Sequence, residues 1–273
     1  MDFELQDVHV LVTGASGGIG LETARLFLKQ GAKVTAHYNT NTSTLNALIA
    51  EFGVERVIAA QADLSVEDDV VRLFAGSKTF GPVQVVIINH GIWPTAHEPV
   101  VIMSLDRWRT TLDANLTSSF LVSREYLRQL EPASDAVKAK ASILFIGSTA
   151  GKYGEAGHAD YAASKSALMY GFTLTLKNEI VKIAPRGRVN AVGPGWVRTP
   201  HKIETLKDPA FVYRALATTP LKKVAEPSDI AAQVVVLSSP SLSGHVTGQV
   251  VMVEGGMEGR LLNRNTEQGL ESL

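Results

Sequence analysis

The stretch VHVLVTGASGGIG, residues 8–20, decides the fold of this chain. Its first half is β-branched and apolar on both faces, which is typical of a strand that helices cover on both sides. Gly14, Gly18 and Gly20 then follow at the spacing TGxxxGxG, and a helical periodicity begins at once. We therefore predict a strand, a glycine-rich turn and a helix in direct succession.

The same alternation of strand and helix repeats along the chain, as in a parallel sheet with right-handed crossovers. The predicted strands are Val8–Thr13, Lys33–His37, Arg56–Ala60, Val85–Asn89, Ser142–Gly147, Arg188–Val192 and Gln249–Val253. The predicted helices lie near residues 18–30, 42–52, 66–76, 104–130, 159–184 and 227–238. The expected fold class is α/β, a doubly wound parallel sheet (Rossmann fold) of about seven strands.

No linker, repeat or low-complexity segment divides this pattern, so residues 1–256 are expected to form one domain. Residues 131–141 are small and polar and predict a surface excursion. Residues 198–226 are proline-containing and of mixed polarity, and predict a mobile flap over the carboxyl edge of the sheet. The polar tail, residues 257–273, is expected either to be disordered or to pack on a neighbouring subunit.

The composition is that of an ordinary soluble globular protein: 273 residues, 45% hydrophobic and 19% charged, with a formal net charge of -1. This balance predicts no general attraction to nucleic acid or to an anionic membrane. Cysteine is absent, which excludes disulfides and thiolate chemistry and favours a reducing compartment. The first residues lack the apolar run of a signal peptide, and no stretch is long enough to cross a bilayer, so a cytoplasmic location is expected.

The glycine turn is a candidate phosphate site. Backbone N–H groups at a helix start, together with the helix dipole, attract anions, and glycines let a pyrophosphate approach the backbone closely. The alternative is a tight turn with no ligand. Asp63 and Asn89 follow the third and fourth strands, and each alone is more typical of a loop-capping side chain. Together at one sheet edge they favour a dinucleotide, with the Asp63 carboxylate accepting a hydrogen bond from the adenine amino group.

Six motifs in register, spanning residues 8–256, make the chain resemble the short-chain dehydrogenase/reductase family. They are TGxxxGxG, Asp63-Leu64, Asn89-x-Gly91, Tyr161-x-x-x-Lys165, NAVGPGWVRTP (190–200) and VTGQVVMVEGG (246–256). One departure is His90, where the family usually has a small residue, and this side chain is expected to crowd the nicotinamide side. The patterns and the resemblance together imply cofactor contacts from Gly14, Ser16, Gly18, Ile19, Gly20, Tyr38, Asn39, Thr40, Asp63, Leu64, Asn89, Gly91, Tyr161, Lys165, Pro194, Gly195, Val197 and Thr199.

Ser148, Tyr161 and Lys165 are the candidate catalytic residues. Tyr161 and Lys165 are four residues apart on a predicted helix and therefore share a face. A free tyrosine has a pKa of about 10, and a neighbouring ammonium lowers it, so Tyr161 is suited to general acid/base work. Ser148 would stabilise charge on the same substrate oxygen. The alternative is a Tyr–Lys pair on a solvated helix face with a capping serine.

The family resemblance implies two further roles. Lys165 would bond the nicotinamide ribose hydroxyls, and Asn115, in LDANLTSSF, would hold a water that links the lysine to solvent as a proton relay. Val197 and Thr199 match positions that touch the carboxamide, although Thr199 is also a candidate helix cap.

The end of the second strand favours NADP over NAD as the cofactor. Alignment on GAKV places Tyr38 where NAD-dependent relatives usually carry an acid, and neutral donors follow it at residues 39–42. A 2′-phosphate would therefore not be repelled. Against this, no Arg or Lys stands there, and Gly17 occupies a position that is often basic in NADP enzymes.

The substrate side is predicted to be aromatic and apolar, which suits an uncharged ring or chain ketone. The candidate residues are Trp93, Tyr153, His158 and Trp196. No cluster of His, Asp or Glu has metal-ligand spacing, so no metal is expected. The helices near 104–130 and 159–184 carry apolar residues on more than one face, and with the resemblance they imply a homodimer or homotetramer.

Three functions stay open on the sequence. The first is an NADP-dependent carbonyl reductase or alcohol dehydrogenase. The second is a non-catalytic NADP(H)-sensing regulator, although such proteins typically lose the Tyr or the Lys that this chain keeps. The third is a 3-oxoacyl-thioester reductase acting on a carrier protein, for which Lys202, Lys207, Lys222 and Lys223 would have to form a basic patch.

Overall fold

A computed structural model describes residues 2–200 and 205–259, and within them seven parallel strands form one sheet in the order β3-β2-β1-β4-β5-β6-β7. The predicted fold class is thereby confirmed. Strand order reverses between β1 and β4, which places the crevice of a doubly wound sheet at their carboxyl ends. The strands are β1 (His9–Val12), β2 (Lys33–Tyr38), β3 (Val57–Gln61), β4 (Val85–Ile88), β5 (Ser142–Ile146), β6 (Arg188–Pro194) and β7 (Val250–Val253).

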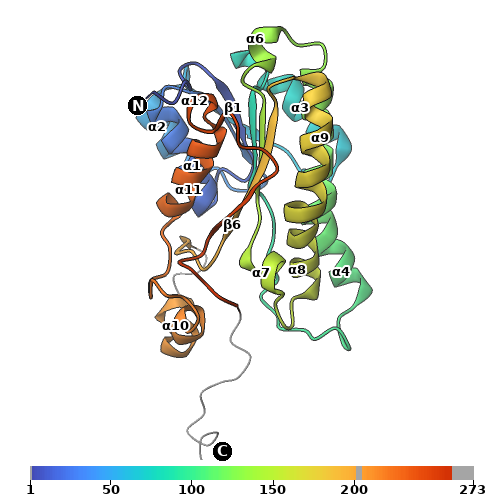
Figure 1. The fold of residues 1–273 in the computed structure, drawn as a ribbon, viewed down its shortest axis with the longest axis vertical. Coiled ribbons are helices and arrows are strands. Elements are labelled where there is room, and N and C mark those ends of the chain that lie inside the picture. The colour runs from blue at the N-terminus through green and yellow to red at the C-terminus, as the bar shows by residue number, and fades with distance from the viewer. Residues whose placement is uncertain (1, 201–204, 260–273) are drawn as a thin grey trace, which may run out of the picture.

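Helices cover both faces of the sheet, α1, α2, α11 and α12 on one side and α3, α4, α8 and α9 on the other (Figure 1). The main helices are α1 (Gly18–Lys29), α2 (Ser43–Phe52), α3 (Glu67–Gly76), α4 (Leu105–Leu112), α5 (Ser118–Leu130), α8 (Ala159–Ser166), α9 (Thr173–Ile183), α10 (Pro209–Leu216) and α11 (Pro227–Ser238). Shorter elements are η1 (Ser77–Phe80), η2 (Asp113–Thr117), α6 (Asp135–Lys138), α7 (Thr149–Tyr153), η3 (Ala167–Phe172), η5 (Thr205–Lys207) and α12 (Pro240–Ser243).

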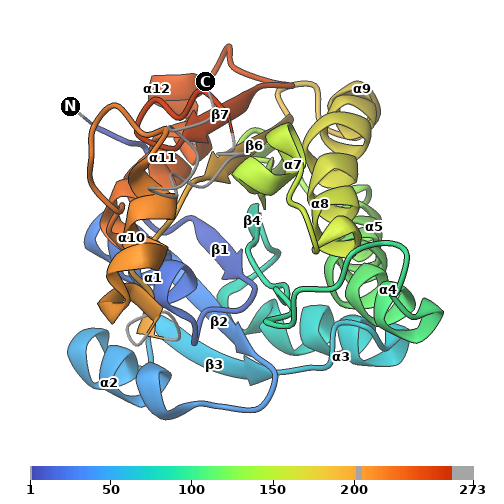
Figure 2. The ribbon, with the colours of Figure 1, turned by 90° about the horizontal axis from the view of Figure 1, so that it is seen from below.

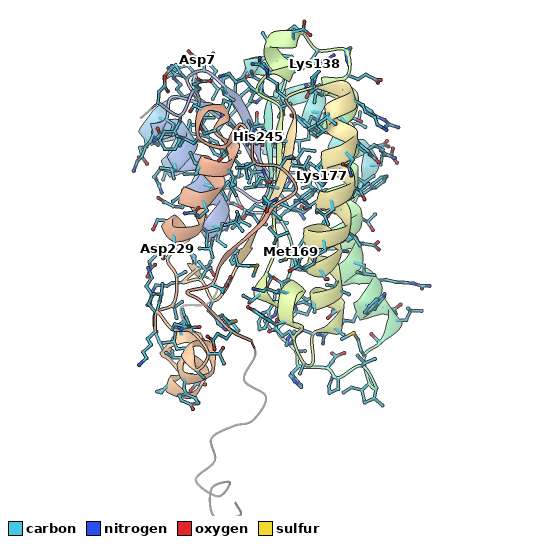
Figure 3. The ribbon with its side chains drawn as sticks, in the orientation of Figure 1. Asp7, Lys138, Met169, Lys177, Asp229 and His245 are labelled. Atoms are coloured by element: carbon cyan, nitrogen blue, oxygen red, sulfur yellow. The ribbon has the colours of Figure 1, made fainter. Side chains whose placement is uncertain are left out.

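Alternate side chains of each central strand point to opposite faces of the sheet and belong to two separate apolar cores. Val10 and Val12 of β1 belong to the apolar cluster beneath α1 and α11, whereas Leu11 between them belongs to the cluster beneath α3 and α5. Met169 lies between the second helical layer and the sheet (Figure 3), with its side chain against Gly147 and Gly193. The prediction of strands buried on both faces therefore holds for the central strands. It is wrong for β3 and β7, which are partly exposed because they form the edges of the sheet.

Two of the predicted helices differ from the observed ones. The segments near 104–130 and 159–184 are each interrupted by a π-helical turn, η2 and η3. At the start of α5 the hydroxyls of Ser118 and Ser119 donate to carbonyl oxygens of η2, four residues earlier, and such back-bonding competes with the regular helical pattern. Asn115 lies within η2, and its side chain is buried.

The segment between β6 and β7 contains more structure than the predicted flap. Asp208 accepts a hydrogen bond from the backbone N of Ala210, and Pro209 occupies the first turn, so α10 begins with two favourable start signals. Figure 2 shows α10 beside the carboxyl ends of the strands. Residues 201–204 of the predicted flap and residues 260–273 of the predicted tail lie outside the described residues.

Candidate active site

The glycine turn after β1 is held in shape by backbone contacts that exclude larger residues. Gly14 has a φ of +62°, which favours glycine, and a Cβ on Gly20 would lie 2.3 Å from the Gly14 carbonyl oxygen. No side chain among the described residues caps α1 at Gly17. The N–H groups at the start of α1 are therefore placed to receive an anion.

A cavity of about 710 Å³ lies in front of this turn, at the place where the adenosine and diphosphate of a dinucleotide are predicted to bind. The predicted cofactor residues that line it are Gly14, Ser16, Gly18, Ile19, Gly20, Asn39, Thr40, Asp63, Leu64, Asn89, Gly91 and Thr199. Tyr38 is absent from that lining and packs against the apolar core instead. Successive strand residues point to opposite faces, which is why His37 and Asn39 line the cavity and Tyr38 does not.

Asn89 and Asp63 each stabilise a turn at the carboxyl edge of the sheet, Asn89 the glycine turn and Asp63 its own. The Asn89 amide donates to the carbonyl oxygens of Thr13 (2.9 Å) and Gly14 (3.1 Å), so it supports the glycine turn from β4. One carboxylate oxygen of Asp63 accepts from the N–H and the hydroxyl of Ser65. Both side chains also line the cavity, so the capping role and the cofactor role are compatible.

Two histidines belong to this site in ways that the sequence did not indicate. The buried His37 accepts a hydrogen bond from Gly14 N at Nδ1 (3.0 Å), so Nε2 carries the hydrogen and donates to the Ala62 carbonyl (3.0 Å). His90 places its ring nitrogens 2.8 Å from the hydroxyls of Thr13 and Ser118. Burial lowers the pKa of both imidazoles. The His90 ring lines the larger, dinucleotide cavity and not the smaller cavity that holds the candidate catalytic residues.

Ser148, Tyr161 and Lys165 converge on that second, smaller cavity of about 190 Å³. Ser148 follows β5, and its hydroxyl accepts a hydrogen bond from Ala150 N (3.1 Å) at the start of α7. Tyr161 and Lys165 lie one turn apart on α8, with the lysine Nζ 5.8 Å from the centre of the tyrosine ring. Of the predicted nicotinamide-side residues, Pro194, Gly195, Val197 and Thr199 line the same cavity.

Lys165 is almost fully buried, and burial disfavours the charged form of its amine. Its Nζ donates to the Ile146 carbonyl oxygen at 2.9 Å. Burial lowers the pKa of Lys165 to about 8, so the ammonium form still predominates at pH 7. An ammonium held in this position favours the phenolate form of a tyrosine beside it.

Asn115 links the loop after β4 to α8, which carries the candidate catalytic residues Tyr161 and Lys165. Its Oδ1 accepts from Ile92 N (2.7 Å), and its Nδ2 donates to Ile92 O (3.0 Å) and to the Ser164 hydroxyl (3.1 Å). A Cβ on Gly91 would lie 2.9 Å from Asn115 Oδ1 and 3.4 Å from Lys165 Nζ, so both groups face this glycine. The structure brings Asn115 to the neighbourhood of Lys165, and its relay role stays a prediction.

The four predicted substrate residues separate into two pairs. Trp93 and Trp196 line the smaller cavity, together with Ile92 and Glu155, which sequence reasoning missed. Tyr153 instead donates to the Met257 carbonyl oxygen (2.6 Å), and the buried His158 stacks on Trp93 with ring centres 4.8 Å apart. Glu155 lies in the glycine-rich loop before Tyr161, and its position there was the available signal.

A doubly wound sheet with a dinucleotide cavity that adjoins a Ser–Tyr–Lys cavity defines an NAD(P)-dependent oxidoreductase. The sequence model of the family described as "Enoyl-(Acyl carrier protein) reductase" matches residues 14–258. The chain belongs to the short-chain dehydrogenase/reductase family, and it is an enzyme that acts on CH–OH or C=O groups.

Three similar proteins from different organisms have names that point to different substrates. The chain is 32% identical over 252 residues to a 3-oxoacyl-[acyl-carrier-protein] reductase of Synechocystis sp., covering 90% of this chain and 95% of the relative. It is 33% identical to 3beta-hydroxysteroid dehydrogenase 1 of Eggerthella lenta, covering 93% and 95%. A solved structure from Brucella melitensis, titled as a short-chain dehydrogenase/reductase, glucose/ribitol dehydrogenase, superposes with a TM-score of 0.82 at 33% identity, covering 94% and 99%.

The described residues contain neither a membrane-spanning helix nor a metal-binding cluster. No helix in residues 2–200 and 205–259 is long and apolar enough to span a membrane. Within the same residues, no three His, Asp or Glu side chains are grouped so as to hold a metal ion.

Proposed function

We propose that this protein is an NADP-dependent carbonyl reductase, or the corresponding alcohol dehydrogenase, for an apolar or cyclic substrate. The observation that carries the proposal is the continuity of the two cavities. Five residues line both of them: Ile19, Asn89, Gly91, Ile92 and Thr199. A dinucleotide laid along the larger cavity would therefore end beside Ser148, Tyr161 and Lys165.

Each catalytic residue has one task in this proposal. Tyr161 passes a proton to the carbonyl oxygen during reduction, and takes it back during oxidation. Ser148 donates a hydrogen bond to the same oxygen and stabilises the charge that develops there. Lys165 favours the phenolate and holds the ribose, while Asn115 supports proton exchange with solvent. When bound, the nicotinamide supplies or accepts the hydride.

NADP is proposed over NAD because the ribose end of the cavity is uncharged. Its lining there consists of the neutral Asn39, Thr40 and Asn41, and the carboxylate of Asp63 lies at the end of the next strand. Neutral amides and hydroxyls bond a 2′-phosphate without repelling it. A side-by-side titration tests this, because equal binding of NADH and NADPH would contradict it.

The substrate walls favour a flat, uncharged carbonyl compound. Trp93, Trp196 and Ile92 present apolar surface beside Ser148 and Tyr161. Ligand sites of this kind gain binding energy from aromatic and apolar walls, while a few polar groups set the orientation. Ring ketones meet both requirements.

A carrier-bound 3-oxoacyl thioester is the second candidate, because several relatives carry that activity in their names. The basic patch that this protein would need for an acidic carrier protein is partly neutralised. Lys223 pairs with Asp229 at 3.0 Å, and the neighbouring Arg198 pairs with Glu226 at 2.8 Å. Lys202 lies outside the described residues.

An assembly of two or four chains is also part of the proposal. Phe120 on α5, Tyr170 on η3, and Leu174 and Val181 on α9 are each at least 40% exposed. Large apolar side chains exposed on neighbouring helices are typical of an interface. Light scattering of the purified protein measures the assembly directly.

The decisive experiment measures NADPH consumption on ring ketones, small acyclic ketones and a 3-oxoacyl carrier thioester. We expect ring ketones to be reduced, and Tyr161→Phe to lower kcat roughly 100-fold or more while NADPH still binds, since the variant lacks the hydroxyl that transfers the proton. If wild type and variant bind NADPH equally and neither consumes it on any of these carbonyl compounds, the result contradicts the reductase and favours a cofactor-sensing regulator. Preference for the thioester would support the second candidate.

A further inference from the structure

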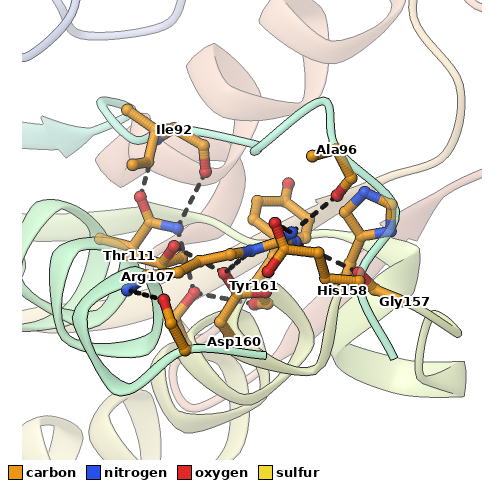
Figure 4. A network of polar contacts seen from close by, with 12 residues as sticks. Ile92, Ala96, Arg107, Thr111, Gly157, His158, Asp160 and Tyr161 are labelled. Atoms are coloured by element: carbon orange, nitrogen blue, oxygen red, sulfur yellow. Dashed lines mark hydrogen bonds and ion pairs between the residues drawn. The ribbon is translucent and has the colours of Figure 1, made fainter. Parts of the chain in front are cut away.

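Arg107 on α4 joins two segments that lie far apart in the sequence (Figure 4). Its Nε donates to Asp160 Oδ2 (3.1 Å), and Nη2 donates to the Gly157 carbonyl oxygen (3.2 Å). Nη1 donates to the Ala96 carbonyl oxygen (2.8 Å) and pairs with Glu98 (3.1 Å). The side chain is only 11% exposed, so these bonds are largely shielded from water.

The two joined segments are walls of the candidate substrate cavity. Residues 92–98 lead away from β4, and residues 154–158 lead into α8. Trp93 of the first segment and Glu155 of the second line the cavity. Three other contacts hold the segments together: Glu98 N donates to Gly157 O (3.0 Å), Trp93 stacks on His158, and the His97 ring meets the His158 ring edge-on.

The other end of the contact lies next to the catalytic tyrosine. Asp160 is completely buried, precedes Tyr161 directly and also accepts a hydrogen bond from the Thr111 hydroxyl (2.7 Å). Burial would raise the pKa of Asp160, but hydrogen bonds from Thr111, Arg107 and the Tyr161 backbone outweigh it and hold the pKa below its ordinary value. The carboxylate therefore stays charged and keeps Arg107 in place.

We propose that Arg107 is a positioning residue that sets the spacing between the Trp93 segment and the Tyr161 helix, and thereby the preference for ring substrates. The proposal rests on the carbonyl reductase function given above. A guanidinium carries five N–H donors in one plane, and at this junction all three of its nitrogens have partners. A lysine at the same place would keep the charge beside Asp160 and lose the bonds to residues 96–98.

The test compares Arg107→Lys with Arg109→Lys, an exposed arginine on the same helix. For Arg107→Lys we expect KM for a ring ketone to rise roughly tenfold or more, because small misplacements in a site have large kinetic effects. Its kcat for a small acyclic ketone should change less than about threefold. Hydrogen exchange of residues 92–98 should speed up, while exchange in the central strands stays as in the wild type. Arg109→Lys should match the wild type in every measurement.

A second variant, Glu98→Gln, removes the charge of one partner of Arg107. It should raise the KM for a ring ketone by less than Arg107→Lys does. If Arg107→Lys matches Arg109→Lys in both ring-ketone KM and exchange, the positioning role is wrong. It is also wrong if ring and acyclic ketones lose activity equally. Should the wild type reduce no carbonyl at all, the proposed function fails, and the exchange data still decide whether Arg107 holds the segment.

Discussion

Lys165 and His37 are buried side chains whose charge depends on their surroundings. Burial lowers the pKa of Lys165 to about 8, which leaves the ammonium easy to deprotonate just above neutral pH. His37 has no free position for a second proton, because Gly14 N–H already points at Nδ1. A charged His37 would therefore have to give up its contact with the glycine turn.

Acid should destabilise the protein partly through His37. Burial, the largest cause, lowers its native pKa below the ordinary 6.5, so below about pH 6.5 the unfolded chain takes up a proton that the native protein does not. Stability is then lost as the pH falls from about 6.5 toward the lowered native pKa. Denaturation at several pH values gives the free energy of unfolding as a function of pH. Its slope should be shallower for His37→Gln, by an amount that corresponds to up to about one bound proton.

The exposed His245 supplies the matched control, because His245→Gln should retain the full slope of the wild type (Figure 3). His9, whose pKa burial lowers to about 4, acts in the same direction and is present in both variants. Identical slopes for His37→Gln and wild type would refute the assignment.

The turn from β1 into α1 shows what one element demands of its sequence. The Asn89 amide and the Gly14 carbonyl occupy the space that a side chain on Gly20 would need. The glycine pattern therefore serves both the packing of the turn and the approach of a diphosphate. Its predictive power comes from this double requirement.

Gly20→Ala should lower the free energy of unfolding by about 1–3 kcal/mol, since the new methyl group would overlap the Gly14 carbonyl oxygen, with a separation of 2.3 Å. Gly171 has no atom within 4 Å of a built Cβ, so Gly171→Ala should be neutral or stabilise by up to about 1 kcal/mol. Chemical denaturation of the two variants gives both values. Equal stabilities would show that the turn relaxes without cost.

At the scale of the whole molecule, polar contacts join the last helices to the sheet and to the first residues. The Arg188 guanidinium at the start of β6 donates to the carbonyl oxygens of Leu237, Ser238 and Ser243. Ser239 donates to the Phe3 carbonyl oxygen (2.7 Å). The Arg188 bonds satisfy carbonyl groups at the ends of α11 and α12, and the Ser239 bond ties the first residues to the segment between these helices.

Arg188→Leu should destabilise the protein by about 3 kcal/mol, because it leaves these carbonyl groups without a donor inside the protein. Burial lowers the pKa of Arg188 to about 10, so the arginine is charged at pH 7 and the loss should be constant between pH 6 and 8. Arg186→Leu, at an exposed site two residues away, should stay within about 0.5 kcal/mol of the wild type. A similar loss in both variants would contradict this role for Arg188.

The sequence by itself determined the strands, their order of appearance and the local motifs. Val10, Leu11 and Val12 are apolar in succession, and Tyr161 and Lys165 are one turn apart, so neighbours in the chain carry the whole signal. Chain geometry over a few residues follows from backbone dihedrals and hydrogen bonding alone. The strand-end positions of Asp63 and Asn89 followed from the same reasoning.

Only the tertiary structure decided which distant residues meet. Arg107 and Asp160 are 53 positions apart, and His37 reaches Gly14 across 23. It also decided that Tyr38 packs into the core while Asn39 faces the cavity, and that the His158 ring stacks on Trp93. Such contacts depend on how helices and strands pack against one another, and no local pattern encodes that packing because many residue pairs of the same types never come together.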